Sequence, residues 1–190
     1  MIIAGFGRFG QVVARALRMK KIPFTALEAN FEQVDFVRKF GNKVFFGDAS
    51  RLDLLHAARA DLAEVFVLAI DDIEASVKTA GIVKKHYPHL KIYARARNRV
   101  HAYRLMDIGV DKLIRETLLS SMELSRDVLV ALGDSTADAN KAIQLFRRHD
   151  EKLLAAQHKL QGDEAQLIAA SKQGADELER LFREDADVTK

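Results

Sequence analysis

The chain has 190 residues, of which 48% are hydrophobic and 30% are charged, and its formal net charge is +3. These proportions are those of an ordinary globular protein with room for one sizeable core. The sequence contains no cysteine, which excludes a disulfide framework, a thiolate nucleophile and any zinc site with Cys ligands, and which fits a reducing, cytoplasmic setting.

The first predicted element is a core strand, because residues 1–4 are apolar and lead straight into a glycine turn. No secretory signal precedes this strand. The longest apolar run, 65–70, is far shorter than the roughly twenty residues of a membrane span. Natural proteins seldom start so abruptly on a core strand. We therefore expect that the chain was cut from a larger protein and that Met1 is an artificial start.

Short apolar runs alternate with amphipathic stretches up to residue 114. The apolar runs predict strands at 1–4, 23–28, 43–46, 64–70, 91–95 and 111–114. The stretches between them predict helices near 9–20, 31–40, 50–59, 72–86 and 99–108. Nearly continuous apolar runs are typical of parallel strands, and this alternation builds right-handed βαβ units. The sequence therefore predicts an α/β fold with a Rossmann-type, doubly wound parallel sheet of about six strands over residues 1–115.

The pattern becomes purely helical over residues 116–190. One helix is predicted at 116–132, followed by a break at 133–136 with N-cap chemistry and a proline-free arm that extends to about 186. One heptad position of this arm carries Phe146, Leu153, Leu160, Leu167 and Leu181 and is interrupted only by Gly174. The partner position is half polar, which is too weak for a free-standing coiled coil. We expect an arm that bends near Gly162 and Gly174 and packs on its own domain or on a second subunit.

The first strand runs into a G-x-G-x-x-G match that consists of Gly5, Phe6, Gly7, Arg8, Phe9 and Gly10. In such a turn Gly5 permits the tight bend, Gly7 the approach of a pyrophosphate and Gly10 the packing of helix on strand. The amides of the following helix then supply an anion site. Glu28 ends the second strand, where a carboxylate accepts from ribose hydroxyls and disfavours the 2′-phosphate of NADP. The alternative is a tight turn that binds nothing.

Further acids follow the third and fourth predicted strands, at the edge of the sheet where ligands bind in open α/β folds. Asp48 is expected either to accept from an adenine amino group or to cap a helix, with Ala49 and Asp71 as further nucleotide contacts. Asp72 is expected to cap the next helix. Arg8 either meets a phosphate or is solvated.

Residues 84–104 form a basic segment without any acid: Lys84, Lys85, Lys91, Arg95, Arg97, Arg99 and Arg104. This segment predicts either a solvated basic face or an anion or docking site. Nucleic acid is disfavoured, because no helix-turn-helix and no aromatic–basic interleaving accompanies the charge. Nothing after residue 116 resembles a substrate domain, and the six histidines show no metal-ligand spacing. We therefore expect a binding module without catalytic residues or a metal site.

Several segments carry a more specific resemblance: IIAGFGRFGQ (2–11), RKFG (38–41), VFFGDA (44–49), AIDD (69–72), YARAR (93–97) and IRET (114–117). Over about residues 1–150 the chain thereby resembles the cytoplasmic RCK/KTN domain of the bacterial Kef (KefB/KefC-type) glutathione-gated potassium efflux systems. The resemblance implies a homodimeric regulatory domain at the cytoplasmic face of the inner membrane, attached to the transport domain of a potassium/proton antiporter. It also implies an adenine nucleotide (AMP or NAD/NADH) as ligand and allows for an ancillary cytoplasmic subunit.

The resemblance further implies a site for glutathione or its S-conjugates at the dimer interface. By motif position this site contains Arg15, Phe40 and Arg115. Two arginines suit the two carboxylates of glutathione, and a bulky S-substituent would push Phe40 aside and shift a two-state interface. Asp150 replaces a family Asn and can accept from the glutathione amine but cannot donate to its carbonyls.

Each of these residues also has a plainer interpretation. Arg15 is then a surface charge, Phe40 a core residue and Arg115 a salt-bridge partner, whereas Gln11 bonds either the turn or a ligand. Two other functions stay open for the whole chain. One is a fragment of an NAD-dependent oxidoreductase, and the other is a constitutive assembly domain that nucleotide merely stabilises.

Overall fold

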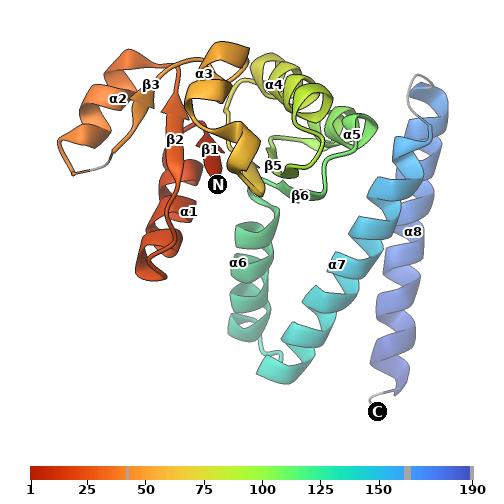
Figure 1. Cartoon of the computed structure of the whole chain (residues 1–190). Coiled ribbons are helices and arrows are strands. Elements are labelled where there is room, and N and C mark those ends of the chain that lie inside the picture. Colours follow the sequence, from red (N-terminus) through yellow and green to blue (C-terminus); the bar gives the residue numbers. More distant parts are fainter. Residues whose placement is uncertain (42, 161–163, 189–190) are drawn as a thin grey trace. The chain divides into compact units, whose positions relative to one another are not determined.

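The structure is a computed structural model that describes residues 1–41, 43–160 and 164–188. The chain divides into two compact units, Met1–Glu116 and Thr117–Lys190. The first unit carries all the strands and the second is helical (Figure 1). The division falls one residue after the expected end of the nucleotide-binding domain at Arg115, because Glu116 still bonds to the first unit.

The first unit is built on a parallel sheet in the order β3-β2-β1-β4-β5-β6. Its strands are β1 (Ile2–Ala4), β2 (Thr25–Glu28), β3 (Phe45–Phe46), β4 (Val65–Leu68), β5 (Lys91–Ala96) and β6 (Lys112–Arg115). Ile3 pairs with Ala26 on one side and with Val67 on the other, so β1 lies at the centre. This strand order confirms the predicted doubly wound fold and places its switch point between β1 and β4.

Five α-helices connect the strands: α1 (Arg8–Met19), α2 (Phe31–Arg38), α3 (Leu52–Ala57), α4 (Ile73–His86) and α5 (Arg99–Ile108). Asn30, Asp72 and Asn98 cap α2, α4 and α5 with their side-chain oxygens. The predicted helix at 50–59 is shorter in the structure. Arg59 adopts left-handed backbone with φ +59, and the chain then turns into the short 3-10 helix η1 (Ala60–Leu62).

The core of the first unit lies where β1 meets the helices. Ile2, Ile3 and Ala4 have no exposed surface, as expected of a central strand covered on both faces. Around them packs one apolar cluster: Ile3, Phe6, Ala14, Ala26, Val34, Val37, Val44, Val67 and Ala69. Burial of each large apolar side chain stabilises the fold by about 1.5–3 kcal/mol, and this cluster fixes the strand ends that carry the candidate site.

The second unit consists of α6 (Leu118–Ala131), α7 (Thr136–His158) and α8 (Glu164–Val188), in which α7 packs against both other helices (Figure 1). The predicted bend at Gly174 is wrong, because α8 runs through this residue. A Cβ on Gly174 would lie 2.9 Å from Leu153 Cδ2, so the glycine allows α7 and α8 to approach closely. The predicted bend at Gly162 lies outside the described residues. Among the helices of the described ranges, none combines the length and the apolar character that crossing a bilayer requires.

Candidate functional site

The glycine turn lies between the end of β1 and the start of α1, at the switch point of the sheet. Gly5 has φ +90, and a Cβ there would lie 2.7 Å from the carbonyl carbon of Ala69. A Cβ on Gly10 would lie 2.2 Å from the Gly5 carbonyl oxygen. Around Gly7, by contrast, a Cβ would meet nothing within 4 Å. Two glycines are therefore required by packing, and the third faces open space.

The N-terminus of α1 is chemically suited to an anion. Its N-cap residue is Gly7, which has no side chain to cap the helix, and the first turn contains no acid. The first amides of a helix have no intrahelical partner and carry partial positive charge. Arg8 is exposed at the same end and forms no ion pair with any residue in the described ranges. This arrangement can bind a phosphate.

Glu28 is bonded to the glycine turn through the backbone. Its Oε2 accepts from the Phe6 N–H at 2.6 Å, and its Oε1 accepts from the Asn30 N–H at 2.9 Å. The Phe6 carbonyl accepts from the side-chain amides of Gln11 at 3.2 Å and Gln33 at 3.3 Å. Gln11 therefore bonds the turn. The Phe6 ring is buried in the core, so this residue shapes the turn and does not present its ring to a ligand.

The acids after β3 and β4 are engaged in local structure. Asp48 accepts from the Ser50 N–H at 2.8 Å and from the Ser50 hydroxyl at 2.9 Å. It therefore shapes a turn, whereas the N-cap of α3 is Arg51. Ala49 is 4% exposed, so its side chain is not available at the surface. Asp72 accepts from the Ala75 N–H at 2.8 Å and caps α4, as the sequence predicted.

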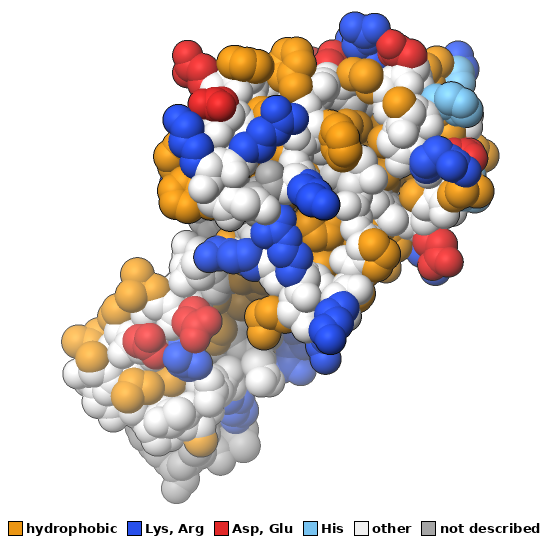
Figure 2. Space-filling model, turned by 60° about the vertical axis from the view of Figure 1, so that its left-hand side comes forward, with side chains coloured by type: hydrophobic (Ala, Val, Ile, Leu, Met, Phe, Trp, Pro, Cys, Tyr) orange, Lys and Arg blue, Asp and Glu red, His pale blue; other side chains and the backbone are white. Residues whose placement is uncertain are grey.

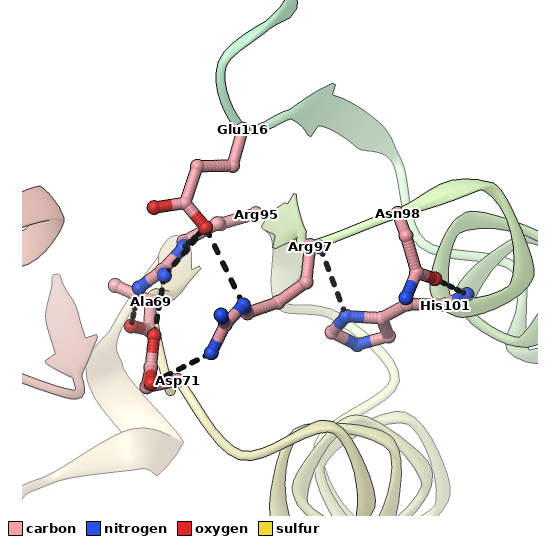
Figure 3. A network of polar contacts seen from close by, with 7 residues as sticks. All are labelled: Ala69, Asp71, Arg95, Arg97, Asn98, His101 and Glu116. Atoms are coloured by element: carbon pink, nitrogen blue, oxygen red, sulfur yellow. Dashed lines mark hydrogen bonds and ion pairs between the residues drawn. The ribbon is translucent and has the colours of Figure 1, made fainter.

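A charge network joins the carboxyl ends of β4, β5 and β6 (Figure 3). Nη2 of Arg95 donates to Asp71 at 2.5 Å and to Glu116 at 2.7 Å. Nη1 of Arg95 donates to the Ala69 carbonyl at 3.3 Å. Arg97 donates to the other oxygen of Asp71 at 2.8 Å and lies 3.6 Å from Glu116. The Arg95 side chain is only 5% exposed, so its charge depends on these partners.

The network touches the glycine turn directly. The guanidinium carbon of Arg95 lies 5.6 Å from the centre of the Phe9 ring, in the first turn of α1. Such a cation–π contact stabilises a partly desolvated arginine by about 1–2 kcal/mol. Ala69, which accepts from Arg95, is also the residue against which Gly5 packs. The two features are therefore parts of one site.

The basic segment 84–104 is not a uniform solvated face, contrary to that interpretation of the sequence. Three of its arginines, Arg95, Arg97 and Arg104, pair with acids from other elements. Arg104 binds Glu74 of α4 with both terminal nitrogens, and this hydrogen bonding holds the pKa of Glu74 below its usual range. Lys84 lies 4.0 Å from Asp111. The acids lie near in space but far in sequence, which is why the segment alone appears unneutralised.

His101 is buried beside the network (Figure 3). Its Nδ1 accepts from the backbone N–H of Arg97 at 3.2 Å, and the backbone N–H of His101 donates to Asn98 Oδ1 at 2.8 Å. Burial lowers the pKa of the His101 imidazole, and the positive charge of Arg104 lowers it further. The neutral ring is therefore the form that the fold accommodates.

The residues expected at a glutathione site come from α1, β6 and α7 and from the turn after α2. Arg15 is exposed on α1, and Arg115 ends β6 partly exposed. Phe40 is 70% exposed and packs on Phe36 with ring centres 5.1 Å apart, so its interpretation as a core residue is wrong. Asp150 lies on α7 in the second unit and is 6% exposed.

Phe40 belongs to a group of exposed phenylalanines on α2, on the turn after it and on β3: Phe31, Phe36, Phe40, Phe45 and Phe46. The side of the molecule that carries these elements in Figure 1 comes forward in Figure 2, where hydrophobic side chains lie exposed among Lys and Arg. Large exposed apolar groups mark surfaces that bind a partner or a ligand.

Sequence reasoning missed the role of Glu116 and the pairing of Arg95 with Asp71. One signal was present in the sequence. Arg95 ends the predicted strand 91–95 and Arg97 follows it two residues later, and residues two apart in extended backbone point to the same face. The identity of their partners could not follow from this pattern, because Asp71 and Glu116 come from other elements.

Two family models match the chain: the TrkA-N domain over residues 1–116, and the potassium efflux system KefB C-terminal domain over residues 120–190. Among solved structures, the Kef C-terminal domain of Shewanella denitrificans in its AMP-bound form is 43% identical. The match covers 85% of this chain and 98% of that chain, with a TM-score of 0.77.

Two further structures share the fold at lower identity. The TrkA-N domain of the inner membrane protein ybaL from Escherichia coli is 21% identical, with a TM-score of 0.57 over 69% of this chain and 94% of its own. GsuK bound to ADP is 25% identical, with a TM-score of 0.53 over 60% of this chain. That match covers only 29% of GsuK.

Proposed function

The chain belongs to the TrkA-N domain family and continues into a KefB C-terminal domain, and on this basis we propose that it is the ligand-sensing regulatory domain of a potassium efflux system. In this proposal the domain regulates transport and performs no catalysis. Its place is the cytoplasmic face of the membrane that holds the transport domain of the same full-length protein. An ancillary cytoplasmic subunit is a further candidate partner.

The observation that carries the proposal is the uncapped N-terminus of α1 at the switch point. Gly7 leaves open space there, and no acid of the first turn opposes an anion. An adenine nucleotide supplies the phosphate that such a site accepts. The AMP-bound Kef domain, which is 43% identical to this chain, supports this ligand class.

Glu28 is placed to hold the ribose of that nucleotide. Each of its carboxylate oxygens accepts one backbone bond, and a carboxylate oxygen has room for a second. The ribose hydroxyls would therefore donate to a group that the turn already orients. Asp48 lies at the end of the neighbouring strand β3, on the adenine side.

We propose that the domain forms a homodimer through its helical unit. On α6 only Met122 is buried, and large apolar side chains on or next to this helix are exposed: Leu119, Leu124, Val128, Val130 and Leu132. A cavity of about 510 Å³ opens beside them, lined by apolar residues of all three helices that include Leu129, Ile143 and Phe146. An apolar helix surface of this kind is expected to be buried against another protein surface. In a homodimer the same apolar surface of the second copy would pack against it.

Glutathione or an S-conjugate is the proposed regulatory ligand of the dimer. Arg15 and Arg115 would bind its carboxylates, Phe40 would contact its sulfur substituent, and Asp150 would accept from its amine. An exposed Phe40 suits this role, because a bulky substituent can displace it without opening the core. Glutathione and its conjugates must differ in their affinities for two arrangements of the dimer if they are to shift the equilibrium between them.

The test is calorimetry of the whole chain, first with AMP and then with glutathione in the presence of AMP. Saturable binding of one AMP and one glutathione per subunit supports the proposal. Binding of AMP without any response to millimolar glutathione would instead favour a constitutive assembly domain that nucleotide stabilises. The absence of any AMP binding would overturn the nucleotide site itself.

A further inference from the structure

A doubly wound sheet offers two half-sites, one on each side of its switch point. The β1–β2–β3 side holds the adenosine of a nucleotide, and the β4–β5–β6 side holds the second nucleotide of a dinucleotide. In this chain the two sides differ sharply. The first side is bordered by the open surface at Gly7 and by Glu28. Charged side chains bridge the second side from β4 to β6 (Figure 3).

The ion-paired side chains lie over the carboxyl ends of all three strands of the second half-site, β4, β5 and β6. Asp71 follows β4, Arg95 lies on β5, and Glu116 follows β6. Arg95 binds both acids, at 2.5 and 2.7 Å. The contact with Phe9 extends this closure to the first turn of α1. A group that leaves the glycine turn in this direction therefore meets the Arg95 side chain next to the turn.

We propose that this network makes the nucleotide site selective for an adenine mononucleotide, because it closes the half-site that the nicotinamide nucleotide of NAD(H) would need. This inference rests on the proposed nucleotide function and specifies that the bound nucleotide is a mononucleotide and not a dinucleotide. The phosphate and adenosine bind at the glycine turn, Glu28 and the β3 end. Arg95 is the residue that determines this specificity, and Asp71 and Glu116 hold it in place.

The physical reason is the burial of the Arg95 charge. To admit a second nucleotide, Arg95 would have to leave two carboxylates while its side chain is 5% exposed. Asp71 and Glu116 are 69% and 27% exposed, so the cost falls on Arg95. A buried guanidinium that loses both carboxylates without a replacement is strongly unfavourable. The nicotinamide nucleotide of NADH brings one phosphate anion and an uncharged ring with one amide carbonyl, so it cannot replace both carboxylates. NADH can then bind only through its adenosine half and gains no affinity from the remainder.

The experiment is a comparison of AMP and NADH affinities by calorimetry on the full chain. The native protein is expected to bind NADH no more tightly than AMP. Arg95→Ala removes the closure and should raise the NADH affinity relative to AMP by about tenfold or more, which corresponds to about 1.4 kcal/mol of added binding free energy. Arg95→Lys keeps a positive charge between Asp71 and Glu116 and should stay selective for AMP.

Arg104→Ala is the matched control. Arg104 is also an ion-paired arginine of the first unit, but it lies on α5, and neither it nor its partner Glu74 on α4 bonds to Arg95, Asp71 or Glu116. The ratio of the two affinities should not change in this variant. Thermal melting reports whether each variant is folded. If Arg95→Ala does not fold, Glu116→Ala loosens the same closure from a partly exposed position and gives the same test.

Two results would overturn the inference and leave the nucleotide site intact. One is native protein that binds NADH about tenfold more tightly than AMP. The other is a folded Arg95→Ala or Glu116→Ala variant with an unchanged ratio of affinities. A native chain that binds neither AMP nor NADH would instead overturn the proposed function, and the inference with it.

Discussion

The carboxylate of Glu28 accepts a hydrogen bond from the backbone N–H of Phe6 at 2.6 Å, which joins the end of β2 to the glycine turn after β1. Twenty-two residues separate the two in sequence. The acid expected to bind ribose is therefore held directly by the turn expected to bind phosphate, and the positions of the two depend on each other. A change at either residue should alter both the stability of the turn and the affinity for nucleotide.

Glu28→Gln tests this coupling. An amide has one acceptor oxygen, so one of the two backbone bonds is lost and the other is no longer charge-assisted. We expect the free energy of unfolding to fall by about 1–2 kcal/mol and AMP binding to weaken. Urea unfolding and calorimetry measure the two effects. Asp35→Asn, in an exposed pair with Lys39, should change neither by much, and equal losses in both variants would contradict the coupling.

Alanine substitutions at two glycines of the turn, Gly7 and Gly10, should separate effects on stability from effects on AMP binding. Gly7→Ala places its methyl group in open space, so the protein should keep its stability and lose AMP affinity, because the methyl group occupies the position of the phosphate. Gly10→Ala should be unstable by several kcal/mol, since its Cβ would lie 2.2 Å from the Gly5 oxygen. Urea unfolding and AMP calorimetry distinguish the two outcomes.

Gly81→Ala is the control for both glycine variants. Gly81 lies within α4, and a methyl group on it would meet nothing within 4 Å. Alanine there should stabilise the helix by up to about 1 kcal/mol and leave AMP binding unchanged. A Gly7→Ala variant that binds AMP as tightly as this control would remove Gly7 from the phosphate site.

Stability should fall as the pH falls below neutrality, because of His101. Its pKa in the folded protein is lowered from the ordinary value of 6.5 by burial and by nearby arginines. Below pH 6.5 His101 takes up a proton in the unfolded chain but not in the folded chain, so the unfolded state binds more protons. Stability is then complete above about pH 7 and decreases below it by at most about 1.4 kcal/mol per pH unit.

His101→Gln is the variant that isolates this effect. Glutamine keeps an acceptor for the Arg97 N–H but does not titrate. Urea unfolding between about pH 5.5 and 8 should show a shallower pH dependence in the variant, with the other five histidines common to both proteins. Parallel curves for the two proteins would mean that another group causes the acid sensitivity.

The homodimer should depend on the exposed apolar side chains of α6. Leu124 is 66% exposed, and Leu124→Glu would place a charge in the proposed interface without disturbing a core. We expect the native chain to be dimeric and this variant to be monomeric by light scattering after gel filtration. Leu62→Glu changes an equally exposed leucine of the first unit and should remain dimeric. A native monomer at high concentration would contradict the proposal.

Glutathione affinity should respond to Arg115 and Asp150 in opposite directions. Arg115→Ala removes a proposed carboxylate partner and should weaken binding by about 1.5–3 kcal/mol, the range for hydrogen bonds to charged groups. Asp150→Asn restores an amide that can donate to the glutathione carbonyls and should strengthen it. Calorimetry with AMP present measures both. An unchanged affinity in Arg115→Ala would remove Arg115 from the site.

The sequence alone determined the fold class, because it depends on local patterns. Apolar runs with turn residues between them located the strands, and the spacing of Gly5, Gly7 and Gly10 located the turn. Even the cap of α4 followed from Asp72, since an N-cap bond joins residues three positions apart. These features rest on interactions between neighbours along the chain, and local patterns record them directly.

Only the tertiary structure decided which charges meet and which glycines bend a helix. Arg95 appeared in the sequence as one of seven basic residues without an acid, yet it is buried between Asp71 and Glu116, 24 and 21 residues away. Gly174 suggested a bend and instead admits Leu153 of the neighbouring helix. Such contacts depend on how the strands and helices pack, and many partners at a distance in sequence are compatible with the same local pattern.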